Sequence, residues 1–344
     1  MTPAQQELHD NLQSYLSQQY GSPVTISGAK PLAGGASRDT WYFSIVVDDE
    51  AQELVLRRDL PSQMFEDALS RKQEFHMMDA AYQQGVKVAK VRWLYEDDSD
   101  DGSDFFIMDY VPGMSIGRRI ITRDEFAEAR KVLPFHMAEE LAKIHTIDFN
   151  QPEFDFLRRP QNGHTAAEDA ITMMYAILDD IGIENPVWEW ALRRVQNTIP
   201  EANEMSFIHG DFRLGNLLVD NKGLTAVIDW EFAHVGDPDE ELGYLCMRDW
   251  RFGAGAKRAA GLTRRETFLK AYESASGRTV NRTSVDWWEL MGNIRWGIIC
   301  MAQANRHLSP DSPEKSVELA SLGRRSAEMQ LESLRLIESY GLFD

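Results

Sequence analysis

Residues 207–231 read FIHGDFRLGNLLVDNKGLTAVIDWE, and the interpretation of the whole chain starts from this stretch. Two apolar runs, Asn216 to Val219 and Leu224 to Ile228, flank a polar turn at Asp220–Gly223. Asparagine and glycine tolerate the backbone angles of a tight turn, so the pattern predicts a β-hairpin. Polar side chains stand at both open ends of this hairpin, where a scaffold would present chemically active groups.

The polar residues around the hairpin form a set with a chemical meaning. His209, Asp211, Arg213 and Asn216 lead into the first strand, and Asp229 closes the second. An aspartate, an asparagine five positions later and a second aspartate are the groups needed to orient a hydroxyl and to hold Mg²⁺ beside phosphates. A polar hairpin in a surface loop is the simpler interpretation of the same residues.

HGDFRLGN resembles the catalytic loop of protein-kinase-like phosphotransferases, in the variant used by aminoglycoside phosphotransferases and choline kinases. IDWE stands where protein kinases carry Asp-Phe-Gly. The resemblance implies that Asp211 accepts or orients the proton of the acceptor hydroxyl, and that Asn216 and Asp229 hold Mg²⁺ on the ATP phosphates. Arg213 matches a position where protein kinases often place a lysine facing the γ-phosphate, and His209 would brace the loop.

The resemblance extends from residue 24 to about residue 335 and implies an α+β, protein-kinase-like bilobal fold. An N-terminal lobe, residues 1–111, would carry an antiparallel β-sheet and bind the nucleotide. A hinge at residues 109–113 would lead to a larger, mainly helical lobe, residues 112–344, which would contain the catalytic loop and the acceptor pocket.

Composition limits the possible functions. The chain has 344 residues, of which 43% are hydrophobic and 26% charged, as in soluble globular proteins. No apolar run approaches the ~20 residues of a membrane span, and two cysteines imply no disulfide framework, so we expect a cytoplasmic protein that does not bind membranes. The net charge of −19 disfavours nucleic acid as a partner. It suits a cationic substrate, but adjacent arginine pairs recur, so an anionic substrate stays possible.

The first lobe should contain the nucleotide-binding turn. Residues 24–26 and 40–47 read as strands, joined by LAGGASRD. In a kinase-like lobe this turn would lie over the ATP phosphates, because glycine lets backbone N–H groups approach an anion closely. The motif lacks the G-x-G-x-x-G spacing, and a plain hairpin turn would look the same. The candidate contacts are Gly34, Gly35 and Ser37.

A third strand is predicted at 53–59, where Val55 and Arg57 share a face because residues two apart in a strand point the same way. The resemblance makes Arg57 the phosphate contact, with a planar bidentate fork in place of the usual lysine. A helix over 65–83, with Phe65, Leu69, Phe75 and Met78 turned inward, would supply Glu74 as the ion-pair partner of Arg57.

Two more strands, 86–93 and 105–110, lead to the connector FIMDYVPG, where Asp109 and Val111 would offer backbone groups to adenine. Beyond it the pattern turns helical. In related kinases, helices at 165–198 wall the acceptor pocket, and Asp237 in the turn GDP should cap the helix that follows. The helices are expected at 134–148, 165–183, 186–198, 263–275, 283–305 and 313–339.

We therefore expect an ATP- and Mg²⁺-dependent O-phosphotransferase that acts on a hydroxyl of a small molecule. WRFG at 250–253 and SLGRRSAEMQ at 321–330 resemble a bacterial branch akin to kinase-like domains fused to acyl-CoA dehydrogenases, which implies a hydroxyacyl-CoA acceptor as an alternative to an aminoglycoside or a choline-like alcohol. A non-catalytic nucleotide-binding protein is the other alternative. Protein kinase activity is disfavoured because GDPDEELG follows IDWE within six residues. The acceptor, ATP versus GTP and the oligomeric state stay open.

Overall fold

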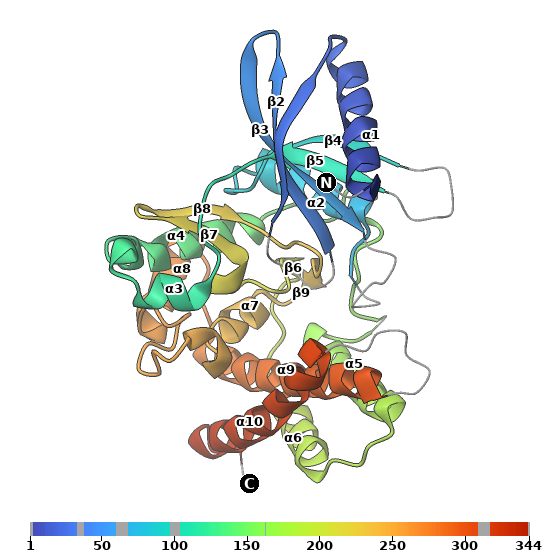
Figure 1. Cartoon of the computed structure of the whole chain (residues 1–344). Helices are drawn as coiled ribbons and strands as arrows, with labels where there is room; N and C mark the ends of the chain where they lie inside the picture. Colours follow the sequence, from blue (N-terminus) through green and yellow to red (C-terminus); the bar gives the residue numbers. More distant parts are fainter. Residues whose placement is uncertain are drawn as a thin grey trace. The chain divides into compact units, whose positions relative to one another are not determined.

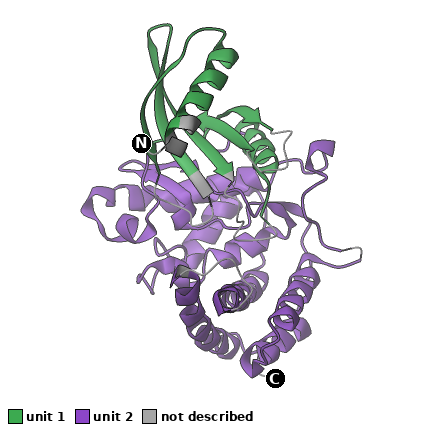
Figure 2. Cartoon of the chain, turned by 45° about the vertical axis from the view of Figure 1, so that its right-hand side comes forward, with its two compact units in different colours: residues 1–83, 88–112 green, residues 84–87, 113–344 purple. Residues whose placement is uncertain are grey.

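The computed structural model describes residues 3–32, 38–59, 68–96, 104–161, 163–308 and 317–342. The chain divides into two compact units, residues 1–83 with 88–112 and residues 84–87 with 113–344 (Figure 2). The first unit contains an antiparallel sheet and the second is mainly helical, which confirms the expected α+β class. Within the described ranges, no helix is both long enough and apolar enough to cross a lipid bilayer.

The first unit is built on one five-stranded sheet of order β1-β2-β3-β5-β4, in which every neighbouring pair is antiparallel (Figure 1). The turn between β2 and β3 is formed by Asp48 and Asp49, both at positive φ, as a two-residue hairpin loop requires. Helix α1 (Pro3–Tyr20) packs Leu16 against the sheet. The strands are β1 (Thr25–Pro31), β2 (Arg38–Val47), β3 (Glu50–Asp59), β4 (Val91–Tyr95) and β5 (Phe105–Asp109).

Helix α2 spans Arg71–Gln83, so the predicted start at residue 65 is wrong. The helix begins after a capping box, in which the Ser70 hydroxyl accepts from the Gln73 amide at 3.3 Å and the Gln73 side chain accepts from the Ser70 amide at 2.9 Å. These two bonds satisfy amides that the first turn leaves without helical partners. Leu69 therefore lies before the helix although it is buried, and Phe65 lies outside the described residues.

The fourth strand begins at Val91, five residues later than predicted. The backbone before it is used elsewhere. The Lys87 amide donates to Glu140 Oε2 at 2.7 Å, and the Lys87 carbonyl accepts from the Val227 amide at 2.7 Å. These bonds make residues 84–87 part of the second unit, so the strand of the first unit begins only after them.

The second unit consists of helices around two small antiparallel pairs, β6 with β9 and β7 with β8. The helix predicted from Pro134 begins earlier, at Ala129, because Ala129 and Leu133 are buried and continue the apolar face past the proline. The helices are α3 (Gly117–Thr122), α4 (Ala129–Ile144), α5 (Ala166–Ile181), α6 (Pro186–Asn197), α7 (Pro238–Tyr244), α8 (Arg265–Ser276), α9 (Arg282–Leu308) and α10 (Val317–Ser339). The strands are β6 (Ser206–Ile208), β7 (Leu217–Asp220), β8 (Gly223–Val227) and β9 (His234–Gly236).

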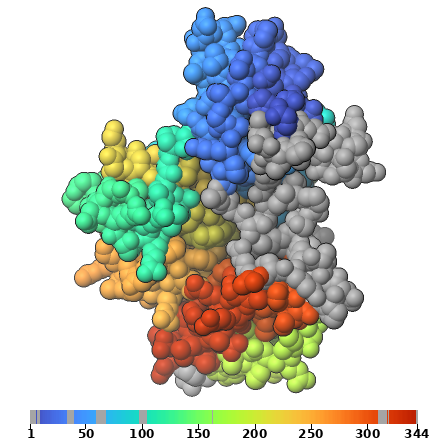
Figure 3. Space-filling model, in the orientation of Figure 1, coloured from blue at the N-terminus to red at the C-terminus, as the bar shows by residue number. Residues whose placement is uncertain are grey.

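Tryptophans fill the core around α9. Trp188, Trp287 and Trp288 are at most 2% exposed, so the latter two pack in the core and do not form a ligand cage. Gly297 lets α6 approach α9, because a Cβ at this position would lie 2.3 Å from the Trp188 ring. Helix α10 packs along α9 and also contacts α6, and these helices share one surface in the space-filling view (Figure 3).

Candidate active site

The predicted hairpin is confirmed. Strands β7 and β8 pair with Leu217 opposite Val227, and the Ile228 amide donates to the Asn216 carbonyl at 3.0 Å. The turn is held by Asp220, whose Oδ1 accepts from the amides of residues 222 and 223. The ladder therefore continues to Asn216 and Ile228, and Asp229 is the first residue after it.

Asp229 has a left-handed backbone with φ of 69°, which is uncommon for a residue other than glycine. Such a conformation costs about 1–3 kcal/mol and is concentrated at functional sites. The backbone turns here immediately after the hairpin, and Trp230 beyond it is fully buried, with its indole N–H donating to the Val227 carbonyl at 3.2 Å. The buried tryptophan anchors the strained turn.

Asp211 is 8% exposed and its carboxylate is surrounded by hydrogen-bond donors. Asn216 Nδ2 donates to Asp211 Oδ2 at 2.6 Å and to the Asp211 carbonyl at 3.0 Å. Arg213 Nε donates to both carboxylate oxygens, at 3.0 and 3.1 Å. Three of the residues selected from the sequence therefore meet around one carboxylate.

Arg213 lies between Asp211 and an aromatic surface. Its guanidinium stands 4.8 Å from the centre of the Trp250 ring, a distance at which a cation and an aromatic face attract. Burial lowers its pKa, but the charge and hydrogen bond of Asp211 together with Tyr244 and Asp229 outweigh burial, so the pKa of Arg213 is raised and the group stays charged. Gly215 makes room for it, because a Cβ there would lie 2.2 Å from Arg213 Nη1.

His209 is fully buried and stabilises the loop through both of its ring nitrogens. Its Nδ1 accepts from the Asp211 amide at 3.3 Å, so its Nε2 carries the proton and donates to the Ile228 carbonyl at 3.2 Å. Burial lowers the pKa of His209, which keeps the ring neutral. One imidazole thus connects the start of the loop to the end of β8, just before Asp229.

Two residues that sequence reasoning did not select complete the loop. Glu241 on α7 accepts from the amides of His209 at 3.2 Å and Gly210 at 3.1 Å. Its Oε2 also lies 2.9 Å from His145 Nε2. Tyr244, three residues along the same helix, donates its hydroxyl to Asp211 Oδ1 at 2.6 Å. Glu241 and Tyr244 are three residues apart and so share one face of α7, but this spacing does not identify the catalytic loop as their partner.

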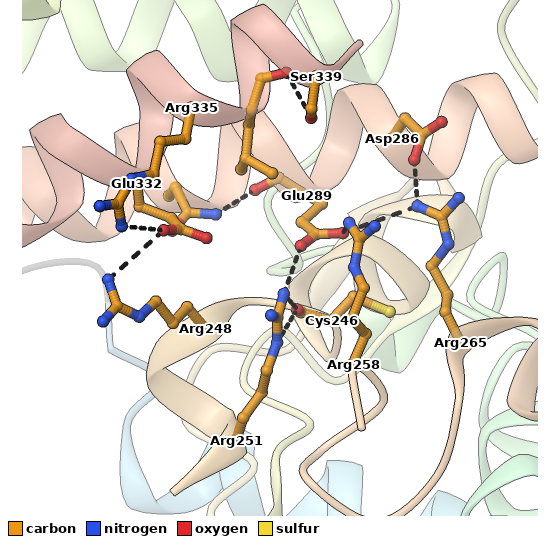
Figure 4. Close-up of polar contacts among 12 residues, drawn as sticks. Cys246, Arg248, Arg251, Arg258, Arg265, Asp286, Glu289, Glu332, Arg335 and Ser339 are labelled. Carbon is orange, nitrogen blue, oxygen red and sulfur yellow. Dashed lines mark hydrogen bonds and ion pairs between the residues drawn. The ribbon is translucent and has the colours of Figure 1, made fainter. Parts of the chain in front are cut away.

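A buried ionic cluster holds the chain that follows α7. Glu289 on α9 is fully buried and accepts from Arg251 Nη2 at 2.9 Å and from Arg258 (Figure 4). Arg251 also donates to the Cys246 carbonyl from Nε at 3.0 Å and from Nη2 at 2.6 Å. The turn after Tyr244 is therefore connected to the core helix through charged hydrogen bonds.

In the first unit, the predicted ion pair is confirmed: Arg57 Nη2 lies 3.1 Å from Glu74 Oε1, with the Glu74 side chain fully buried. Arg71, not anticipated, donates to the same carboxylate. The Asp109 amide donates to the Lys90 carbonyl at 2.9 Å, so this backbone donor is already used. Val111 follows β5 without regular structure, and Gly34, Gly35 and Ser37 lie outside the described residues.

The donor set around the hairpin suits a hard cation held jointly with phosphates. Among the described residues, no group of three or more His, Cys, Asp or Glu side chains gathers as a metal site. Asn216 Nδ2 is bound to Asp211, which turns its planar amide so that the oxygen faces the other way. Asn216 and Asp229 would therefore supply two oxygen ligands, and Mg²⁺ commonly completes its shell with phosphate oxygens and water.

Known proteins are similar to this chain in sequence and in fold. A family model described as "Phosphotransferase enzyme family" matches residues 28–278. A mouse (Mus musculus) protein, acyl-CoA dehydrogenase family member 10, is 28% identical over 220 residues, which cover 62% of this chain and 20% of the relative. The chain thus matches about a fifth of that relative's length.

Solved structures show the same fold over nearly the whole chain. A candidate aminoglycoside phosphotransferase from Ralstonia eutropha has a TM-score of 0.74 at 23% identity, covering 96% of this chain and 98% of the other. A mutant of aminoglycoside phosphotransferase APH(4)-Ia, crystallised with ADP and hygromycin B, has a TM-score of 0.59 at 17% identity, with 96% and 98% covered. These likenesses confirm the kinase-like fold, and with the family match over residues 28–278 they establish that the chain is an enzyme of the phosphotransferase enzyme family.

Proposed function

We propose that this enzyme transfers the γ-phosphoryl group of ATP to a hydroxyl of a small molecule, with Mg²⁺ bound. The observation that carries the proposal is the Asp211 carboxylate, held by Asn216 and Arg213 beside a hairpin that delivers Asp229. This is the arrangement that phosphoryl transfer needs, since the chemistry depends mostly on positioning and on charge stabilisation.

Asp211 would orient the acceptor alcohol. Its donors hold the carboxylate in one place and leave it exposed enough, at 8%, to receive one hydroxyl. A hydroxyl within about 2.6–3.2 Å of a carboxylate oxygen is aligned for attack and can lose its proton as the new bond forms. The proton would pass to Asp211 while the oxygen of the alcohol bonds to phosphorus and ADP leaves.

Positive side chains would offset charge on the transferring group. Arg213 lies next to Asp211 and stays charged, and Arg57 would contact phosphate oxygens while Glu74 holds its guanidinium. Bound Mg²⁺ would neutralise charge on the phosphate oxygens. In a site that excludes water, such fixed charges stabilise the transition state more strongly than solvent does.

A hydroxyacyl-CoA is the acceptor class favoured by one specific observation, the similarity to acyl-CoA dehydrogenase family members. The structural relatives bound to hygromycin B and spectinomycin favour an aminoglycoside or aminocyclitol. The net charge of −19 adds weight to a cationic acceptor, although it does not describe the site itself. The first measurement is therefore which class of acceptor stimulates the release of ADP.

The test is ADP release from Mg·ATP with a panel of acceptors: aminoglycosides, choline-like alcohols and hydroxyacyl-CoA esters. We expect one class to accelerate release, and Asp211→Asn to reduce that rate by orders of magnitude while Mg·ATP binding measured by calorimetry persists. Asp220→Asn is the matched control, because Asp220 lies in the turn of the same hairpin and the amide keeps its acceptor oxygen. No stimulation by any class, or equal rates for Asp211→Asn and the parent, would refute the proposal.

A further inference from the structure

Asp211 receives one donor that does not belong to its own loop. The hydroxyl of Tyr244 donates to Asp211 Oδ1 at 2.6 Å, as short as the bond from Asn216 Nδ2 to Oδ2. We infer that Tyr244 is a positioning residue, whose hydroxyl fixes the plane of the Asp211 carboxylate toward the acceptor alcohol. The inference rests on the role proposed above for Asp211.

The need for a second donor follows from the flexibility of the side chain. The torsion that turns an aspartate carboxylate about its Cβ–Cγ bond is broad and has no sharp minima. Asn216 holds Oδ2, and Arg213 Nε is shared between both oxygens at 3.0 and 3.1 Å. Neither of these bonds alone prevents rotation of the carboxylate. Rotation is prevented when each oxygen accepts a short bond from a different element of the structure. Tyr244 supplies the bond on the Oδ1 side.

Tyr244 is itself held firmly. It ends α7, and Glu241 on the same face accepts the amides of His209 and Gly210, which ties the helix to the catalytic loop. Gly243 lets α7 press against α9, because a Cβ at this position would lie 2.6 Å from the backbone of Glu289. The chain after Tyr244 is anchored by the hydrogen bonds of Arg251 (Figure 4). The hydroxyl therefore cannot drift from Asp211 without moving a packed helix.

The hydroxyl is also a permanent donor. Burial raises the pKa of Tyr244 well above its ordinary value, and the neighbouring Asp211 carboxylate raises it further. The phenol stays protonated at any pH at which the enzyme would work. A carboxylate has about four lone-pair directions. Tyr244, Asn216 and Arg213 are three donors to Asp211, so one direction is left for the acceptor hydroxyl, and where it points depends on the plane of the carboxylate.

A purely structural role makes a different prediction. The Tyr244 ring packs 5.4 Å from the Trp250 ring, and phenylalanine preserves that packing. Tyr244→Phe therefore removes the hydroxyl alone. Tyr20→Phe is the matched control, because the Tyr20 hydroxyl also donates a short bond, to Gln52 Oε1 at 2.7 Å, and this bond between α1 and β3 does not hold Asp211.

The experiment measures kcat and the KM for Mg·ATP in the parent, in both phenylalanine variants, and in each combined with Asp211→Ala. We expect Tyr244→Phe to lower kcat about 10- to 100-fold, the loss typical of a misplaced catalytic group, with the KM for Mg·ATP within about twofold of the parent. In the Asp211→Ala background the same change should alter kcat less than about twofold, because there is no carboxylate left to position. Tyr20→Phe should keep kcat within about twofold of the parent while lowering the denaturation midpoint.

The outcomes separate this inference from the proposed function. A parent that is inactive on every acceptor overturns the proposed function and this role with it. An active parent whose Tyr244→Phe variant keeps its kcat overturns the positioning role alone. An increased kcat, or a loss of equal size in the Asp211→Ala background, overturns it as well, because the hydroxyl would then block the site or act only through stability.

Discussion

Gly210 is the position at which adding a single methyl group, by the substitution Gly210→Ala, should distort the catalytic loop most. Its backbone has a φ of +85°, a region that residues with a Cβ rarely adopt. A Cβ added here would lie 2.2 Å from the Phe232 carbonyl oxygen and 2.8 Å from its carbonyl carbon. Both contacts are with backbone, so no side chain can turn aside to relieve them.

The size of the effect of Gly210→Ala follows from these two features. The left-handed conformation costs an L-residue about 1–2 kcal/mol, and forcing an extra group into a packed site adds about 1–3 kcal/mol. The free energy of unfolding should therefore fall by about 2–5 kcal/mol. To reach an ordinary contact of 3.4 Å from 2.2 Å, the loop and Phe232 must separate by about 1 Å. A displacement of that size next to Asp211 should lower kcat about 100-fold.

Gly85→Ala is the control, because Gly85 has nearly the same φ, +77°, with nothing within 4 Å of the added Cβ. Its free energy of unfolding should fall only by the cost of the left-handed backbone, about 1–2 kcal/mol, and its kcat should not change. Urea denaturation followed by tryptophan fluorescence gives the free energies, and ADP release with the best acceptor gives kcat. If Gly210→Ala matched Gly85→Ala in both quantities, the steric argument for this loop would be refuted.

Two further changes test the support of the second unit. Burial would raise the pKa of Glu240, but His234 and Arg295 outweigh burial and lower it to about 2. The ionised carboxylate therefore adds up to about 3 kcal/mol to the free energy of unfolding above pH 4.5. This contribution is lost as the pH falls toward 2. Glu240→Gln should accordingly destabilise the protein at pH 7, and urea titrations at several pH values should show the difference from the parent shrinking below pH 4.5; a constant difference would contradict the assignment. Asp237→Ala should lower the free energy of unfolding by about 2–4 kcal/mol in the same titrations, because Asp237 caps α7 at the Asp239 amide and accepts from Asn203 Nδ2. Asp237→Asn should retain most of the stability. Equal losses in the two variants would argue against the cap.

Features encoded by neighbouring residues were predictable from the sequence. The hairpin follows from apolar runs on both sides of a turn, and its ladder pairs Asn216 with Ile228, the residue before Asp229. The cap at Asp237 could also be predicted, since a cap needs only the next few residues, whereas the pair Arg57–Glu74 was implied by the family resemblance. The start of α2 was missed although its signal, Ser70 followed by Gln73, is local.

The sequence by itself determined the chemistry of the loop: an aspartate, an asparagine and a second aspartate at spacings set by one short hairpin. The family resemblance carried by this loop also implied the α+β class. The roles proposed for these residues still await the measurements above.

Only the tertiary structure decided what holds Asp211 in place. Tyr244 reaches it from 33 residues away, and Glu241 binds the loop amides from 31 and 32 residues away. Nothing in the residues near the loop encodes these contacts, because they depend on how α7 packs against α9, with Gly243 setting the approach. A hydrogen bond between distant segments forms where packing brings its donor and acceptor within 3 Å, and no local pattern of sequence records that distance.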